Sequence, residues 1–236
     1  MIKRLLMKKK QILDVLVFVL LAILSGIMIG MGATASLYAQ HLYDSWGKLI
    51  GACLFSLGIF AILTFQFKLF TGMVAGIPDM KRKDLWQLPA CFLGNALGVA
   101  IVALLVSVTP LADVTVPLGT QGIANKLANE YWPLLSLCSS IFCGILITLS
   151  VWSWKYVPEK GLSATLGAVF PIIFFAFCGF DHSVANMLYF YYLGEFSWRV
   201  VGYIALSILG NILGGVVIPL VFKLQNYVNK QENPLS

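Results

Sequence analysis

The sequence Leu-Gly-Asn-Ala-Leu-Gly at positions 93–98 has a close counterpart in Leu-Gly-Asn-Ile-Leu-Gly at positions 209–214. The two copies lie in the third and the sixth of six long apolar runs. A pattern shared at corresponding places indicates a duplicated unit of three spans, although chance similarity between two Gly- and Leu-rich helices would also produce it. Two copies with an odd number of spans must have opposite orientations in one membrane. The sequence therefore predicts two inverted three-helix repeats, over about residues 12–110 and 130–224.

The composition of the chain indicates a membrane protein. Its 236 residues are 59% hydrophobic and only 11% charged, and the mean hydropathy is +0.88, which excludes an ordinary soluble domain. A spanning helix needs about 20 mostly apolar residues. The apolar runs cover approximately residues 15–39, 49–67, 88–108, 134–154, 162–193 and 200–222. We therefore expect an all-α membrane protein, with six transmembrane helices in a single transmembrane domain of residues 1–236.

Positive charge predicts how the chain is oriented. Cations cluster before span one and after spans two, four and six: Lys3, Arg4, Lys8, Lys9, Lys10, Lys81, Arg82, Lys83, Lys155, Lys160, Lys223 and Lys230. The opposite loops hold only Lys48, Lys126 and Arg199. Because cytoplasmic loops are enriched in Lys and Arg, we expect a multi-pass protein of the cell membrane with both short tails in the cytoplasm. The net charge of +6 then reflects topology and contact with membrane lipids, not binding to nucleic acid.

Spans two and five each contain residues that an uninterrupted span would avoid. Span two meets Lys-Leu-Phe-Thr-Gly at positions 68–72, and span five meets Gly-Phe-Asp-His-Ser-Val-Ala-Asn at positions 179–186. Non-helical backbone at membrane depth is tolerated only where protein buries it or where it lines a wet cavity. Helices two and five are therefore predicted to be interrupted and to meet at a central permeation site.

The polar residues of the two interruptions are candidates for the site. His182 is predicted to face a pore, where it offers one donor and one acceptor; the alternative is a structural histidine satisfied by a backbone carbonyl. Thr71 is a candidate gate or substrate hydrogen bond, or alternatively a helix cap. For Asp181 we favour a helix cap over a proton relay, and Asn186 is expected to satisfy freed backbone groups.

Other candidates for the site lie outside the polar residues of the two interruptions. Lys126 lies in the external connection 122–129, and by pattern alone it is a solvated loop residue. Large apolar side chains flank the interruptions and are candidates for hydrophobic collars, although such residues in membrane helices more often form the core or face lipid: Phe55, Ile59, Leu69, Phe70 and Phe175.

These motifs resemble the formate/nitrite transporter family over essentially all six spans. The resemblance rests on Leu-Phe-Thr-Gly at 69–72, on the run at 179–186, on the two Leu-Gly-Asn helices and on Phe-Ser-Leu-Gly at 55–58. It implies a homopentamer of aquaporin-like protomers, each with its own pore for formate, nitrite, lactate or hydrosulfide.

The resemblance also implies roles for individual residues. Thr71 matches the threonine of the loop that interrupts span two, His182 the central pore histidine and Asn186 its polar companion, while Lys126 matches a lysine near the outer vestibule. The collar candidates divide into a cytoplasmic constriction (Ile59, Leu69 and Phe70) and a periplasmic one (Phe55 and Phe175).

Together these features predict a channel or transporter for small monovalent anions that passes the anion with a proton. A bare anion crossing apolar collars would incur a large desolvation cost, and protonation removes most of it. Lys126 would concentrate the anion, and His182 would supply hydrogen bonds or the proton.

Two other classes of protein compete with this hypothesis. An aquaporin-like channel for water or ammonia is the alternative, although the sequence lacks paired Asn-Pro-Ala helix starts. A membrane enzyme or haem-binding anchor would need a catalytic motif or a second imidazole in the apolar body, and the sequence has neither. We therefore expect no enzyme, no cofactor and no metal.

Overall fold

The computed structural model describes residues 2–159 and 161–232. Lys160 lies outside these residues, and the side chains of Lys3, Arg4 and Lys8 are not described, so the predicted clustering of cations is not tested at these four positions. The described helices are α1 (Ile2–Leu42), α2 (Asp44–Thr64), α3 (Phe70–Val74), η1 (Ile77–Asp79), η2 (Arg82–Asp84), α4 (Gln87–Ser107), α5 (Ala112–Ala128), α6 (Trp132–Tyr156), α7 (Leu162–Cys178), α8 (Asn186–Leu193) and α9 (Trp198–Glu232).

Most of these helices have the length and composition of membrane spans. Among the described residues, α1, α2, α4, α6 and α9 each provide an apolar segment long enough to cross a membrane. The apolar helix α7 is shorter. It ends at Cys178 and is followed by Gly179, which has the left-handed φ of 75° that favours glycine, and α8 begins after a short interruption. The all-helical membrane architecture predicted from the sequence is confirmed.

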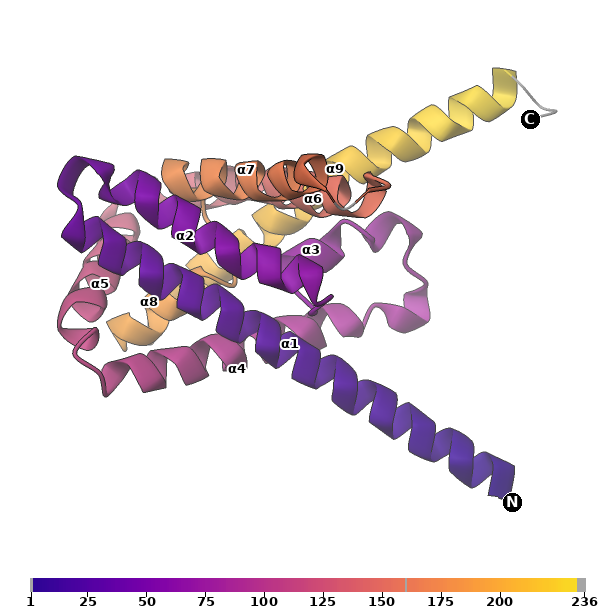
Figure 1. Cartoon of the computed structure of the whole chain (residues 1–236), viewed down its shortest axis with the longest axis horizontal. Helices are drawn as coiled ribbons and strands as arrows, with labels where there is room; N and C mark the ends of the chain where they lie inside the picture. Colours follow the sequence, from indigo (N-terminus) through magenta and orange to yellow (C-terminus); the bar gives the residue numbers. More distant parts are fainter. Residues whose placement is uncertain (1, 160, 233–236) are drawn as a thin grey trace.

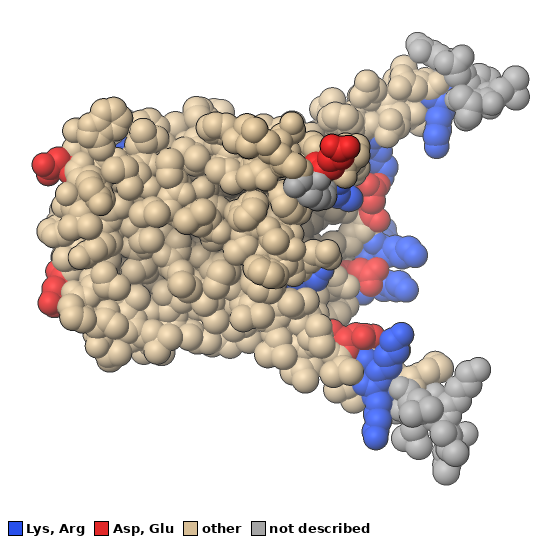
Figure 2. Space-filling view, viewed as in Figure 1, with Lys and Arg blue, Asp and Glu red and all other residues tan. Residues whose placement is uncertain are grey.

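The two ends of the molecule differ in structure and in charge. Both chain termini project from the same end, whereas α5 and α8 lie at the opposite end, called here the distal end (Figure 1). Lys and Arg side chains gather at the terminal end, while the broad middle of the visible face is almost free of charge (Figure 2). An uncharged band between two ends suits a bilayer, because a charged side chain in the hydrocarbon region is costly.

In two pairs of helices, α1 with α4 and α6 with α9, the two backbones come into close contact. A Cβ atom on Gly26 or Gly98 would collide with the backbone of the facing helix in the α1–α4 pair. Gly144 and Gly214 are confined in the same way between α6 and α9. Small residues allow such close helix packing in membranes. The pairs bring Asn95 on α4 and Asn211 on α9 into the protein interior, where both side chains are fully buried.

The structure corrects two expectations about local structure. Thr71 was expected within the loop that interrupts span two, but the interruption lies at residues 65–69, and Thr71 belongs to the first turn of α3. The connection that holds Lys126 was expected to be a loop, but it is part of the helix α5. Its buried residues Thr115, Gly119, Ile123 and Leu127 recur every fourth position, so they form one stripe along the helix. The glycine and asparagine residues between them obscured that period.

Candidate functional site

Asn95 holds the first interruption in place. Its side-chain Oδ1 accepts a hydrogen bond of 2.8 Å from the N–H of Phe70. Its Nδ2 donates bonds of 2.8 Å to the carbonyl oxygens of Ala22 and Lys68. The amide therefore binds the backbone on both sides of Leu69. Backbone groups freed by the interruption are thus satisfied inside the protein, as they must be at membrane depth.

Asn211 holds the second interruption by the same arrangement. Its Oδ1 accepts a bond of 2.8 Å from the N–H of Ser183, and its Nδ2 donates to the carbonyl oxygens of Ser140 at 2.8 Å and Asp181 at 3.0 Å. This amide binds the backbone on both sides of His182. Leu69 and His182 therefore occupy corresponding positions in the two interruptions.

His182 connects the second interruption to the first turn of α3. Its Nε2 lies 3.0 Å from the hydroxyl oxygen of Thr71, and both side chains are buried. Its Nδ1 accepts a hydrogen bond of 3.0 Å from the N–H of Ala185. Since Nδ1 is an acceptor, the ring proton resides on Nε2, which donates to Thr71. The imidazole is then neutral, and the threonine hydroxyl keeps its own proton to donate.

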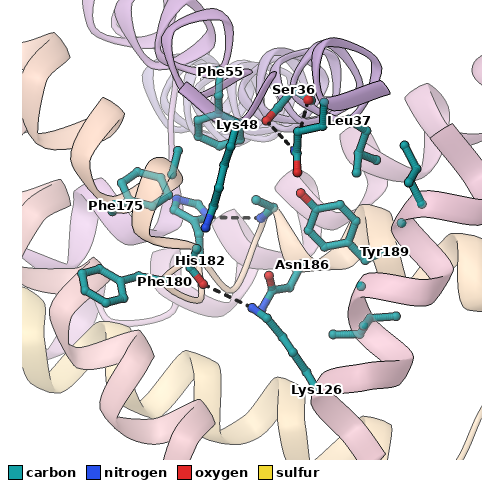
Figure 3. Close-up of a pocket in the computed structure, with 18 residues that line it drawn as sticks. Ser36, Leu37, Lys48, Phe55, Lys126, Phe175, Phe180, His182, Asn186 and Tyr189 are labelled. Atoms are coloured by element: carbon teal, nitrogen blue, oxygen red, sulfur yellow. Dashed lines mark hydrogen bonds between the residues drawn. The ribbon is translucent and has the colours of Figure 1, made fainter. Parts of the chain in front are cut away.

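A cavity of about 210 Å³ opens above His182 at the distal end (Figure 3). Of the residues predicted from the sequence, His182, Asn186, Lys126, Phe55 and Phe175 line it. The rings of the two phenylalanines meet edge to face, with centroids 5.6 Å apart. Phe175 also stacks on the imidazole of His182 at 5.7 Å. An apolar wall thus lies directly beside the buried polar pair.

The remaining predicted residues lie away from this distal cavity. Ile59, Leu69 and Phe70 are not part of its lining, but they belong to the same buried apolar cluster as Phe55 and Phe175. Thr71 reaches the cavity only through its hydrogen bond to His182. The structure therefore brings the two sets of collar candidates into one core, with the Thr71–His182 pair between helices from both halves of the chain.

Lys126 and Asp181 form an ion pair at the edge of the distal cavity. The Nζ atom of Lys126 lies 2.6 Å from Oδ1 of Asp181, a carboxylate whose side chain is only 3% exposed. Asn186 donates a bond of 2.9 Å to the same oxygen, and Lys126 also donates to the carbonyl of Gly179 at 3.3 Å. The preferred role of Asp181 as a helix cap is therefore wrong. His182, through Nδ1, accepts the N–H at the start of α8 instead.

Sequence reasoning missed several residues that line the distal cavity. Lys48 and Tyr189 are among them, together with Ser36 and Gln40. Tyr189 follows Asn186 by three positions in α8, so their shared helix face was a usable signal. Lys48 was visible as one of the few cations on its side of the membrane. Which of these cations enters a cavity depends on helix packing, which hydropathy does not report.

These features define a class of protein. Interrupted helices that meet at a buried polar pair beneath a cavity are typical of proteins that move solutes across membranes.

No group of three or more His, Cys, Asp and Glu side chains suited to a metal ion occurs within residues 2–159 and 161–232.

Comparison with known proteins gives the family. The family model described as formate/nitrite transporter matches residues 3–224. The uncharacterized transporter YrhG of Bacillus subtilis strain 168 is 29% identical over 221 residues, covering 84% of this chain and 80% of that protein. The nitrite transporter NirC of Salmonella typhimurium strain LT2 is 26% identical over 211 residues, covering 82% and 77%. The chain belongs to the formate/nitrite transporter family, because the model matches nearly all of it.

A solved structure shows the same fold. A pentameric formate channel with formate bound aligns with a TM-score of 0.74 at 20% sequence identity, and the match covers 91% of this chain and 98% of that one. The family implied by the sequence motifs is thus confirmed, and the all-helical chain has the fold of that channel.

Proposed function

We propose that the protein is a transmembrane pore for small monovalent anions of the formate, nitrite, lactate or hydrosulfide type, and that each anion passes with a proton. The observation that carries this proposal is the hydrogen bond between His182 and Thr71 at the base of the distal cavity. It supplies a neutral polar group inside an otherwise apolar path. The relatives named as a nitrite transporter and a formate channel point to the same class of solute.

The proposed architecture has six spans in two inverted repeats, over about residues 12–110 and 130–224 of one transmembrane domain. The equivalent bonds of Asn95 and Asn211 support it, because each amide clamps the residue at the same place in its half. Helices α7 and α8, with the interruption between them, count as the fifth span. The basic end of the molecule then faces the cytoplasm, with both chain ends, and the distal end faces outward.

The proposed path crosses two apolar constrictions. Phe55 and Phe175 form the outer one, and Ile59, Leu69 and Phe70 form the inner one. All five side chains are at least 95% buried and carry no charge. An anion entering such surroundings would lose its hydration without gaining a counter-charge. Protonation during passage removes that cost, which is the physical reason for coupling the anion to a proton.

The polar groups of the path have separate proposed roles. Thr71 donates a hydrogen bond from its hydroxyl group to the permeating species. His182 holds the threonine by a hydrogen bond, and any proton that it passes to the anion is one that it has first received from water. The Lys126 ammonium has three N–H groups, and its bonds to Asp181 and Gly179 leave one for an anion. Asn186 fixes the carboxylate that holds Lys126.

The proposed assembly is a homopentamer in the cell membrane, as in the formate channel of the same fold. Exposed leucine and phenylalanine side chains along the spans, such as Leu104, Leu105 and Phe170, suit contact with lipid or with neighbouring protomers. A monodisperse monomer in mild detergent that still conducts anions would contradict the pentamer.

The proposed function is tested by flux into liposomes that contain the purified protein. Formate, nitrite, lactate and hydrosulfide are supplied separately at two pH values, and internal anion and internal pH are recorded together. We expect saturable uptake of at least one anion, accompanied by internal acidification. Water or ammonia flux without anion flux would establish the aquaporin-like alternative. Anion uptake that generates a membrane potential and no pH change would show that the anion passes without a proton.

A further inference from the structure

Two lysines enter the distal cavity, and their charges are not equivalent. Lys48 comes from the first turns of α2, and Lys126 comes from the last turn of α5, so they reach the cavity from opposite sides (Figure 3). The charge of Lys126 is compensated by Asp181 at 2.6 Å. Because this carboxylate is buried and has to stay paired, Lys126 contributes little net positive charge to the cavity.

Lys48 lacks such a partner. Its Nζ lies 5.7 Å from the ring centroid of Phe177 on α7. Within residues 2–159 and 161–232, the ion pairs with a nitrogen and an oxygen no more than 4.0 Å apart do not include Lys48. Asp44 stands one turn earlier on the same helix, outside that distance. An aromatic ring attracts an ammonium group but carries no net charge, so the positive charge of Lys48 stays uncompensated.

We propose that Lys48 is the residue that draws monovalent anions into the distal cavity. Of the charges at this cavity, the Lys126–Asp181 pair cancels, and Lys48 supplies the net positive charge. The ammonium lies 5.7 Å from the ring centroid of Phe177, and Lys48 enters the cavity on the side of Phe55 and Phe175 (Figure 3). From there its charge attracts anions over a range set by the ionic strength. Lys126 then acts at short range as a hydrogen-bond donor. This inference rests on the proposed function and names the residue that selects its anions.

A transport experiment compares three variants at low ionic strength. Lys48→Gln removes the charge, Lys48→Arg keeps it, and Lys155→Gln is the matched control, because Lys155 is also exposed and lies 5.0 Å above the Tyr156 ring at the other end of the molecule. The attraction between two opposite unit charges 4 Å apart in water raises the binding affinity about fivefold. We therefore expect about fivefold slower uptake by Lys48→Gln from a dilute anion solution, and near wild-type uptake by the other two variants.

Salt and saturation sharpen the transport test. The deficit of Lys48→Gln is expected to shrink at about 1 M salt, where the Debye length falls to about 3 Å, and at a saturating anion concentration. Equal uptake by Lys48→Gln and wild type at low salt would overturn the inference. A loss as large in Lys48→Arg as in Lys48→Gln would also overturn it, because the charge would then be irrelevant.

A second measurement does not depend on transport. Gln40 lines the cavity and is exposed, so Gln40→Cys places a reporter thiol there, once the exposed Cys53, Cys138 and Cys178 are replaced by serine. The rate of its modification is measured with a sulfonate-bearing and with a trimethylammonium-bearing thiosulfonate reagent. We expect Lys48→Gln to lower the ratio of the anionic to the cationic rate several-fold. An unchanged ratio overturns the inference. A lowered ratio in a protein that passes no anion supports it and refutes the proposed function alone.

Discussion

The Nε2 atom of His182 lies 3.0 Å from the hydroxyl oxygen of Thr71, so one hydrogen bond joins two residues that are 111 positions apart in the chain. Each belongs to an interrupted span, and each interruption is held by a buried asparagine. The bond can therefore form only when the two halves of the protein are packed correctly against each other.

The first prediction concerns the hydroxyl group of Thr71. Thr71→Val keeps the shape of the side chain and removes its hydrogen bond to His182, while Thr71→Ser keeps the hydroxyl. A hydrogen bond of about 1 kcal/mol corresponds to a roughly fivefold change in rate if it acts on the permeant at the barrier. We expect anion flux to fall by about that factor in Thr71→Val and much less in Thr71→Ser, measured in liposomes with equal protein content. If the flux through Thr71→Val equalled the wild-type flux, the hydroxyl group of Thr71 would have only a structural role.

The second prediction concerns pH. Acid supplies the proton that accompanies the anion, so we expect wild-type flux to rise as the pH falls. The Nδ1 atom of His182 accepts a bond from Ala185, so a second proton on the ring would break that bond. His182→Asn keeps a polar side chain that does not titrate near neutral pH. We expect the His182→Asn variant to conduct anions, with a flux that depends less on pH than the flux through the wild-type protein.

The measurement for this prediction is flux against pH for both proteins with one permeant anion. Superimposable curves would mean that protonation of the anion in bulk water sets the dependence. His182 would then be a hydrogen-bonding residue only.

The third prediction concerns the ion pair of Lys126 and Asp181. Lys126→Ala leaves a carboxylate that is 3% exposed without its counter-charge. Loss of one partner of a buried pair costs about 3–5 kcal/mol, and we expect about 2 kcal/mol here because the Lys126 side chain is 40% exposed. Thermal unfolding in detergent should show this loss, whereas Lys126→Arg should retain most of the stability and of the transport.

The control for the ion pair is the double variant Lys126→Ala with Asp181→Asn, which removes both charges. We expect it to be more stable than Lys126→Ala alone, because no uncompensated charge remains buried. A double variant as unstable as the sum of its single changes would show that the two side chains act independently.

The fourth prediction concerns the two asparagines that hold the interruptions. Asn95→Ala and Asn211→Ala each remove three hydrogen bonds to backbone groups, and all of these bonds except the one to Lys68 are buried. An unsatisfied buried group costs about 1–3 kcal/mol, so we expect each variant to lose at least about 3 kcal/mol of stability or to fail to assemble. Asn125→Ala on the exposed side of α5 is the matched control and should melt like wild type. Similar melting of all three variants would show that the interruptions do not need the asparagines.

Much of the membrane architecture was predictable because its signals are local. Long apolar runs indicated the helices, and polar residues within two of those runs indicated the interruptions. The repeated Leu-Gly-Asn pattern singled out Asn95 and Asn211, and His182 was conspicuous as the one histidine within the apolar runs. Each of these inferences needs only the chemistry of a short segment and the low polarity of a bilayer.

What only the tertiary structure decided involves segments far apart in the chain. The sequence by itself determined the membrane-spanning helices and the fact that two of them are interrupted, because the requirement to satisfy backbone groups in lipid acts along each segment. The pairing of Lys126 with Asp181 spans 55 positions and depends on α5 folding as a helix over α8, which its glycine and asparagine residues concealed. The entry of Lys48 into the distal cavity depends on how α2 packs beside α7. Charge compensation acts through space, so only the packed helices show which lysine is neutralised and which remains free to attract an anion.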